Sequence, residues 1–187
     1  SSQFISSILL ISPVLQNGMQ LKINSDLVSK PYIEMTLKLM SEFGIHWEWN
    51  KNKIEITPQK YVGKDIAIES DWSAVTFWFE IAALAEKCNI RLNGLFKESI
   101  QGDKKVVKLF EKLGVASVFK NNQLILTKNE ENSLPTEIDL LETPDMYQPL
   151  KCTLSALSLN PKITGLQTLK DKETNRIYAV KNELEKL

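Results

Sequence analysis

The sequence SEFGIHWEWNKNKIEIT, residues 41–57, aligns without a gap with a second stretch, EKLGVASVFKNNQLILT, residues 111–127. One pattern thus occurs twice at a spacing of about 70 residues. In each copy a helical pattern ends at a glycine, Gly44 or Gly114, because glycine adopts the positive φ that closes a helix at little cost. Two apolar runs around an Asn/Lys turn follow each glycine and predict a β-hairpin. The chain therefore contains repeated units.

The segments around these two copies extend the repeat. Apolar residues at helical spacing precede each glycine, and the same spacing begins a third time at Ile177. Upstream of each such helix we predict a more apolar helix, and between the two helices a short strand. The more apolar helices are predicted at 4–15, 72–87 and 147–159, and the connecting strands at 20–23, 89–92 and 162–164.

Two further predicted strands, 65–69 and 137–141, complete a β-α-β-α-β-β unit. The predicted fold class is α+β, with mixed sheets and amphipathic helices packed on their faces. Helices that are apolar nearly all round, such as 72–85, are expected to be buried at the centre. The chain would hold the latter part of one unit, one whole unit and most of a third.

Composition excludes several function classes. The 187 residues include 23 Lys+Arg and 23 Asp+Glu, so no net positive field attracts nucleic acid or an anionic membrane. The apolar runs are too short to span a bilayer, and Cys88 and Cys152 lack a metal-binding spacing and are expected to be reduced. These observations predict a cytoplasmic protein. The abrupt start and end of the sequence predict a piece of a longer chain.

Residues 171–176, DKETNR, form the strongest candidate site, because Lys172 and Arg176 flank a predicted helix start. Cations in a first turn oppose the helix dipole, so either Asp171 and Glu173 compensate them or an anion binds there. The stretches at Ser29, Asp71 and Gln101 are each explained more simply as helix N-caps. His46 is the only histidine and is expected to lie on a surface or sheet face.

Six separated motifs occur in an order and spacing that resemble the 5-enolpyruvylshikimate-3-phosphate synthase family. They are Ser1-Ser2-Gln3-Phe4, Ser29-Lys30-Pro31-Tyr32, Glu69-Ser70-Asp71-Trp72-Ser73, Gln101-Gly102-Asp103, Pro144-Asp145 and Lys172-Glu173-Thr174-Asn175-Arg176. The resemblance covers the whole chain. It implies the enolpyruvyl transferase fold, an inside-out α/β barrel built from β-α-β-α-β-β units, here incomplete.

The resemblance also implies an activity and its substrates. The complete enzyme would transfer the enolpyruvyl (1-carboxyvinyl) group of phosphoenolpyruvate to the 5-hydroxyl of shikimate 3-phosphate and release phosphate, without a metal or organic cofactor. By position, the residues implied in binding shikimate 3-phosphate are Ser1, Ser2, Gln3, Ser29, Tyr32, Asp145 and Lys172. Gln3 and Arg176 are implied in binding phosphoenolpyruvate.

Asp145 and Glu173 are the implied catalytic residues. Asp145 matches the carboxylate that accepts the proton of the attacking hydroxyl, and Glu173 matches the carboxyl group that transfers a proton at the methylene carbon. The reaction needs such a base and acid, and cations to hold two highly charged anions. The sequence departs from the family pattern at Asn175, Ser70 and Lys170, where Asp, Gly and Arg are usual.

The resemblance places residues 1–62 in the last unit of one domain and residues 63–187 in the first two units of the second. The family's other phosphate-binding motifs lie outside this sequence, so we expect the chain alone to be inactive and to self-associate through uncovered surfaces, and the complete enzyme to be a monomer. Two alternatives remain open: a UDP-N-acetylglucosamine enolpyruvyl transferase, and a non-catalytic remnant that binds anions.

Overall fold

The structure is a computed structural model, which describes residues 2–24, 27–129 and 133–187 and divides the chain into two compact units. Unit 1 is Ser1–Ala67 and unit 2 is Ile68–Leu187. The division falls a few residues after the boundary expected at residue 62. The assignment of the two units to two domains of a larger enzyme stays a prediction.

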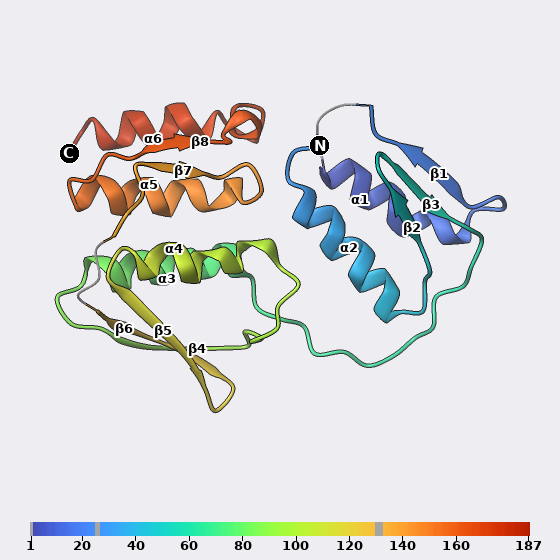
Figure 1. The fold of residues 1–187 in the computed structure, drawn as a ribbon, viewed down its shortest axis with the longest axis horizontal. Coiled ribbons are helices and arrows are strands. Elements are labelled where there is room, and N and C mark those ends of the chain that lie inside the picture. The colour runs from blue at the N-terminus through green and yellow to red at the C-terminus, as the bar shows by residue number, and fades with distance from the viewer. Residues whose placement is uncertain (1, 25–26, 130–132) are drawn as a thin grey trace. The chain divides into compact units, whose positions relative to one another are not determined.

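Unit 1 contains two helices and a three-stranded antiparallel sheet (Figure 1). Its elements are α1 (Ser2–Ile11), β1 (Met19–Lys22), α2 (Lys30–Glu42), β2 (Glu48–Asn50) and β3 (Lys53–Ile56), with the strands in the order β1-β3-β2. Apolar residues at helical spacing on α2 and alternating residues on β3 form one core. Its buried members are Leu9, Ile33, Leu37, Met40, Ile45, Ile54 and Ile56.

The first repeat of unit 2 has the same order of helices and strands as unit 1. Its elements are α3 (Trp72–Leu84), β4 (Asn89–Asn93), α4 (Val106–Glu111), β5 (Val115–Lys120) and β6 (Gln123–Lys128), with the strands in the order β4-β6-β5. The hairpins also share their register, since Trp49 pairs with Ile54 in unit 1 and Phe119 pairs with Leu124 in unit 2. The helix-glycine-hairpin repeat predicted from the sequence is thus confirmed.

The remainder of unit 2 consists of β7 (Glu137–Asp139), α5 (Tyr147–Ala156), β8 (Lys162–Thr164) and α6 (Arg176–Leu184). β7 and β8 pair in parallel, as expected for strands joined through a helix. α5 packs on α3 and on α6, so one buried cluster extends through the whole unit. The α+β fold class is confirmed.

One predicted strand does not form. Residues 65–69 run as extended chain without strand pairing, and both three-stranded sheets are wholly antiparallel, so the expectation of mixed sheets was wrong. β4 lies at the edge of its sheet, and Ser70 contacts only its end: the Ser70 N–H donates to Gly94 O over 2.7 Å and the Ser70 hydroxyl donates to Asn93 O over 3.3 Å. An alternating pattern becomes a strand only when a partner lies beside it, and Ile68 is 83% exposed.

Gly94 and Gly165 close equivalent corners, each directly after a strand. Both have φ of +77°, a left-handed conformation that L side chains rarely adopt. A Cβ on Gly94 would lie 2.4 Å from Ser70 Oγ, and one on Gly165 would lie 2.1 Å from the Leu141 backbone nitrogen. Both corners therefore need glycine for conformation and for space.

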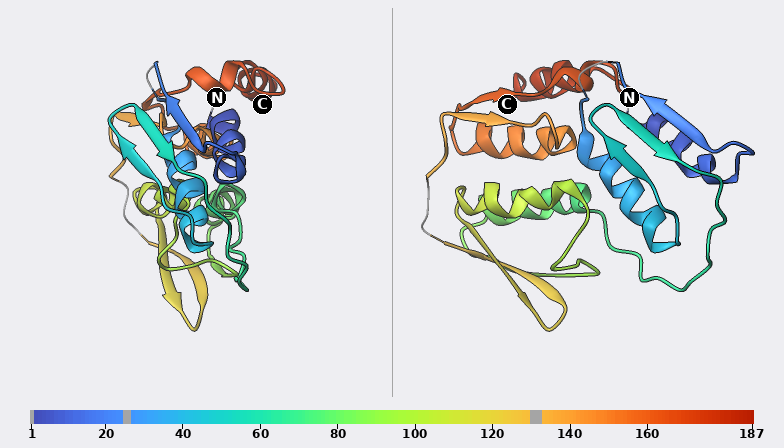
Figure 2. Two further views of the ribbon diagram at one scale, coloured as in Figure 1. Left: turned by 90° about the vertical axis from the view of Figure 1, so that its right-hand side faces the viewer. Right: turned by 45° about the vertical axis from the view of Figure 1, so that its right-hand side comes forward.

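α3 is only partly buried, which corrects the expectation of a helix covered on all sides. Figures 1 and 2 show the β4-β6-β5 sheet on one side of α3 and α5 on another, and Trp72 and Phe79 are fully buried. A third stripe of α3 is exposed. It consists of Phe77, Trp78, Ile81 and Leu84. No helix within residues 2–24, 27–129 and 133–187 is long and apolar enough to cross a membrane.

Candidate active site

The start of α6 carries the predicted charged cluster. The helix begins at Arg176, and the side chain of Asn175 caps it by accepting the Tyr178 N–H over 3.1 Å. Lys172 and Glu173 precede the cap in a turn after a short 3₁₀ helix, Gln167–Lys170. Arg176 thus lies in the first turn, as the sequence predicts, whereas Lys172 and Glu173 lie before the cap and not in the first turn.

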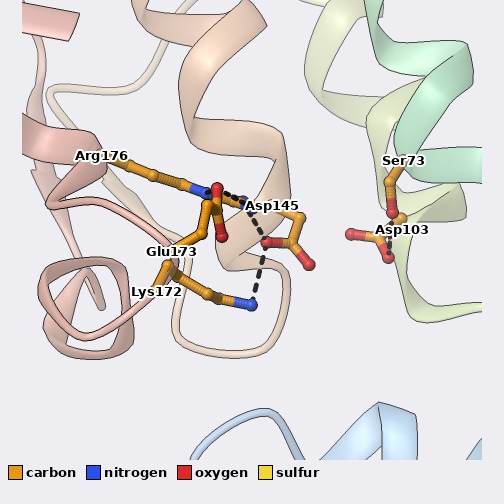
Figure 3. Close-up of polar contacts among 6 residues, drawn as sticks. All are labelled: Ser73, Asp103, Asp145, Lys172, Glu173 and Arg176. Carbon is orange, nitrogen blue, oxygen red and sulfur yellow. Dashed lines mark hydrogen bonds and ion pairs between the residues drawn. The ribbon is translucent and has the colours of Figure 1, made fainter. Parts of the chain in front are cut away.

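Asp145 completes this cluster from a different element. It lies in the 3₁₀ helix Pro144–Met146, where proline occupies the first position and α5 follows directly. Arg176 Nη1 donates to Asp145 Oδ1 over 2.8 Å, and Lys172 Nζ lies 3.4 Å from the same oxygen (Figure 3). Residues 31 positions apart in sequence thus meet at one carboxylate.

Arg176 bridges the two carboxylates of the cluster. Its Nη2 and Nε lie 2.8 Å and 2.9 Å from Glu173 Oε1, while its Nη1 holds Asp145. The side chains of Arg176, Lys172 and Asp145 are 18%, 23% and 27% exposed, whereas that of Glu173 is 64% exposed. Three charges are therefore partly shielded from water, and the fourth closes the cluster from the solvent side.

The pKa of Glu173 lies below its ordinary value. The main cause is the hydrogen bond from its own backbone N–H, followed by the hydrogen bond from Arg176, and the positive charges of Arg176 and Lys172 act in the same direction. Glu173 is thus ionised near neutral pH in this arrangement.

The start of α3 lies close by, since α3 packs against the 3₁₀ helix that carries Asp145. Asp71 caps α3 by accepting the Ser73 N–H over 2.8 Å, which confirms the capping interpretation at this position. The Ser73 hydroxyl donates to the carboxylate of Asp103, which is 2% exposed (Figure 3). The 3₁₀ helix Gly102–Lys105 is therefore tied to the first turn of α3.

Glu69, which sequence reasoning missed, is the centre of the network at this helix start. Its Oε1 accepts from Trp72 Nε1 over 2.7 Å and from the Phe96 N–H over 2.9 Å. Its Oε2 accepts from Ser99 Oγ over 2.7 Å and from Gln101 Nε2 over 3.1 Å. The Gln101 side-chain oxygen in turn accepts the Trp72 N–H over 2.9 Å. Gln101 thus caps α3 from a loop that is distant in sequence. It does not cap the 3₁₀ helix that follows it, as the sequence had suggested.

The remaining predicted site residues lie in unit 1. Ser2 and Gln3 form the first turn of α1, and Tyr32 lies in the first turn of α2. Ser1 lies outside the described residues. The two helices run the same way in Figure 1, and Thr36 of α2 donates to Ser6 Oγ of α1 over 2.8 Å, so both helices begin at the same end of unit 1.

Ser29 differs from its expected role as a helix cap. Its side chain forms no capping hydrogen bond, because its backbone is left-handed, with φ of 61° and ψ of 38°. The carbonyl of Ser29 accepts the Tyr32 N–H over 3.2 Å instead. Ser29 is 6% exposed and sits beside the start of α2. His46 is exposed, and Cys88 and Cys152 are free and part-buried.

Comparison with known proteins assigns the family. Residues 1–187 match the sequence profile described as EPSP synthase (3-phosphoshikimate 1-carboxyvinyltransferase). The chain belongs to the EPSP synthase family. It is 43% identical over 188 residues to a 3-phosphoshikimate 1-carboxyvinyltransferase of Bacteroides fragilis, with 100% of this chain and 46% of that protein covered. A relative of the same name from Methanosphaera stadtmanae is 34% identical over 191 residues, with 99% of this chain and 44% of that protein covered.

Solved EPSP synthase structures share the fold. A structure of EPSP synthase from Acinetobacter baumannii matches with a TM-score of 0.65 at 20% identity, and covers 97% of this chain and 42% of that chain. The enolpyruvyl transferase fold implied by the sequence is therefore confirmed for the part that is present. The chain spans less than half the length of the relatives it matches.

The departures from the family pattern have local structural consequences. Asn175, where EPSP synthases usually have Asp, still caps α6, because either side chain offers the oxygen that the cap requires. Ser70, where Gly is usual, fits against Gly94 and donates from its hydroxyl to Asn93 O over 3.3 Å. Lys170 ends the 3₁₀ helix before the charged turn and is exposed.

Proposed function

We propose that this chain forms part of an enzyme that transfers the 1-carboxyvinyl group of phosphoenolpyruvate to the 5-hydroxyl of shikimate 3-phosphate and releases phosphate. The observation that supports the proposal best is the meeting of Asp145, Glu173, Lys172 and Arg176 at the starts of α5 and α6. The family membership of the chain supports the choice of substrates. Two tunable carboxyl groups and two cations in one cluster suit an acid-base reaction between anions.

The chemistry assigns one task to each carboxyl group. The 5-hydroxyl oxygen adds to the enol carbon of phosphoenolpyruvate, its proton passes to Asp145, and the methylene carbon receives a proton from Glu173. Loss of phosphate and of a methyl proton then restores the carboxyvinyl group. Partial burial of Asp145 between Lys172 and Arg176 keeps that carboxylate in place for the attacking hydroxyl.

Arg176 links substrate binding to the protonation of Glu173. A carboxylate or phosphate bound by the guanidinium group competes with Glu173 for the same N–H donors. Loss of that contact raises the pKa of Glu173, because the hydrogen bond and the nearby positive charge both favour the ionised form. In our proposal, binding of phosphoenolpyruvate thus prepares Glu173 to act as an acid.

The family resemblance assigns a binding role to four further residues of unit 1, namely Ser2, Gln3, Ser29 and Tyr32. They lie at the common end of α1 and α2, where serine hydroxyls suit a phosphate. Ser1 belongs to the same proposed group by its sequence position. We propose that these residues bind shikimate 3-phosphate together with Asp145 and Lys172.

The test compares the 187-residue chain with the protein encoded by its complete open reading frame. Phosphate release is measured with both substrates present. We expect turnover by the complete protein and none by the chain alone, since the other phosphate-binding motifs of the family lie outside this sequence. Phosphate release by the 187-residue chain alone at an ordinary enzymatic rate would contradict the expectation that this chain is inactive. Binding without turnover by the complete protein, measured by calorimetry with shikimate 3-phosphate, would favour a non-catalytic remnant.

Variants of the complete protein test the assigned roles. Asp145→Asn and Glu173→Gln are each expected to lower kcat by roughly 10²–10⁴-fold, the usual contribution of a positioned acid or base. Glu183→Gln is the matched control, because Glu183 lies on the same helix and its carboxylate contacts only exposed Lys186. If the control lowers kcat as much as Glu173→Gln, the role of Glu173 is refuted. Tighter binding of UDP-N-acetylglucosamine than of shikimate 3-phosphate would refute the proposed substrate.

A further inference from the structure

A groove in unit 2 lies apart from the residues assigned above. It is formed by the corner after β4, residues 94–97, and by the tip of the β5–β6 hairpin, residues 119–122, which projects from the unit in Figure 1. Its volume is about 570 Å³, within the range of small-molecule sites. The lining residues are Gly94, Leu95, Phe96, Lys97, Phe119, Lys120, Asn121 and Asn122.

The lining of the groove combines aromatic surface with positive charge. Phe96 is 41% exposed and Phe119 is part-buried, so the groove offers phenyl surface to a ligand. Lys97 and Lys120 are exposed, no lining residue is acidic, and neither ammonium group forms an ion pair with any described residue. The groove is thus complementary to a ligand with an aromatic ring and a negative charge.

The other repeats lack this combination. The corner after β8 carries Gln167 and Thr168 at the positions of Phe96 and Lys97. In the unit 1 hairpin the aromatic residue paired like Phe119 is Trp49, and Lys30 of the chain itself lies over its ring, 5.1 Å from the centroid. The open aromatic and cationic lining therefore belongs to the middle repeat alone among the described residues.

Both walls of the groove contact the network at the start of α3. The Phe96 N–H and the Trp72 indole N–H share Glu69 Oε1, at 2.9 Å and 2.7 Å. The Phe119 ring lies 6.3 Å from the Trp72 ring between centroids, tilted by 54°. A ligand that displaces either phenyl ring alters the environment of the buried Trp72 indole.

We propose that this groove binds a small planar aromatic anion, with its ring against Phe96 and Phe119 and its charged group near Lys97 and Lys120. The site is separate from the charged cluster at α6. Its occupancy is coupled to the start of α3 through Trp72 and Glu69.

The test is an NMR titration of the ¹⁵N-labelled 187-residue chain with 2-naphthoate. We expect saturable shifts of the amide signals of 94–97 and 120–122 and of the Trp72 indole signal, with a Kd of about 1 mM, as is usual for a ligand of about 13 non-hydrogen atoms. Neutral 2-naphthamide, which has the same shape, and non-aromatic cyclohexanecarboxylate are each expected to bind at least about threefold more weakly.

Variants locate the site. Lys97→Gln and Lys120→Gln are each expected to weaken 2-naphthoate binding roughly threefold, and both together about tenfold. Lys108→Gln is the matched control, because Lys108 is an exposed lysine on α4 outside the groove. All three side chains are exposed, so these variants are expected to fold.

Several outcomes would overturn the proposal. Equal binding of 2-naphthamide would show that the groove does not select a negative charge. Shifts centred on the exposed stripe of α3 at Phe77 and Trp78 would show binding to another apolar surface. A lack of saturation, or an equal loss of affinity in Lys108→Gln, would show that no defined site exists.

Discussion

The starts of α3 and α6 lie in the same unit and are held by different chemistry. At α3, Glu69, Asp71 and Gln101 accept hydrogen bonds from the Trp72 indole and from backbone N–H groups. At α6, the cap is a neutral amide, and two cations bind two carboxylates near the solvent. The contrast agrees with our proposal that the charged cluster at α6 binds a ligand, while the network at α3 fixes the fold.

Removal of Glu69 is the strongest test of that contrast. Glu69→Ala deprives four donors of their acceptor, so we expect the free energy of unfolding to fall by about 3 kcal/mol. Urea denaturation of the chain measures this change. Glu98→Ala is the control, because Glu98 is exposed and lies in the loop that supplies three of these donors; it is expected to change stability by less than about 0.5 kcal/mol. Similar effects of the two variants would show that the network does not fix the start of α3.

Removal of the N-cap side chains of α3 and α6 is expected to have a smaller effect on stability than removal of Glu69. Asp71→Ala and Asn175→Ala are each expected to lower the free energy of unfolding by about 1 kcal/mol, because each removes the side chain that accepts a helix N–H. Asn175→Asp keeps this acceptor and is expected to leave stability unchanged within about 0.5 kcal/mol. Asp65→Ala, in the exposed connecting segment, is the control. If Asp71→Ala lowers the free energy of unfolding and Asn175→Ala does not, α6 does not depend on its cap.

Among these variants, Arg176→Gln is expected to change the free energy of unfolding least. It is expected to change the pKa of Glu173 clearly. Without the guanidinium group, the pKa of Glu173 rises towards its ordinary value. A depressed folded-state pKa contributes stability above the unfolded-state pKa of about 4.3, and that contribution is lost as the pH falls through the folded-state value. The wild-type chain is therefore expected to lose more stability on acidification than the variant.

A ¹³C NMR titration of the glutamate carboxyl groups measures this shift directly. Lys181→Gln is the control, since Lys181 is exposed and pairs with Glu185 on the same helix. An unchanged pKa of Glu173 in Arg176→Gln would show that the arginine contact does not control its ionisation.

The sequence predicted the parts of the fold that local pattern determines. Both hairpins, the helices before Gly44 and Gly114, and the helix starts at Trp72 and Arg176 agree with the structure. The strand expected at 65–69 had the right alternation, but pairing depends on what lies beside β4, which no local pattern records. The exposed stripe of α3 was missed for a similar reason, since apolar composition does not state which neighbours are present.

The candidate site was predictable to a similar extent. The charges at Lys172 and Arg176 stand out locally because they oppose the helix dipole, whereas Asp145 was found through the family resemblance. Glu69 appeared only as a letter of one family motif and its role was missed, because three of its four donors come from residues 27 to 32 positions away and only the tertiary fold brings them together. The left-handed backbone at Ser29 was likewise invisible in a stretch that reads as an ordinary cap.

The two glycine corners place a limit on how these repeats can diverge. At Gly94 and Gly165 a single added carbon would collide with a neighbouring atom, so in a saturation library every substitution at these two positions is expected to be depleted. The pair therefore marks equivalent points in the two repeats and gives a fixed origin for superimposing them.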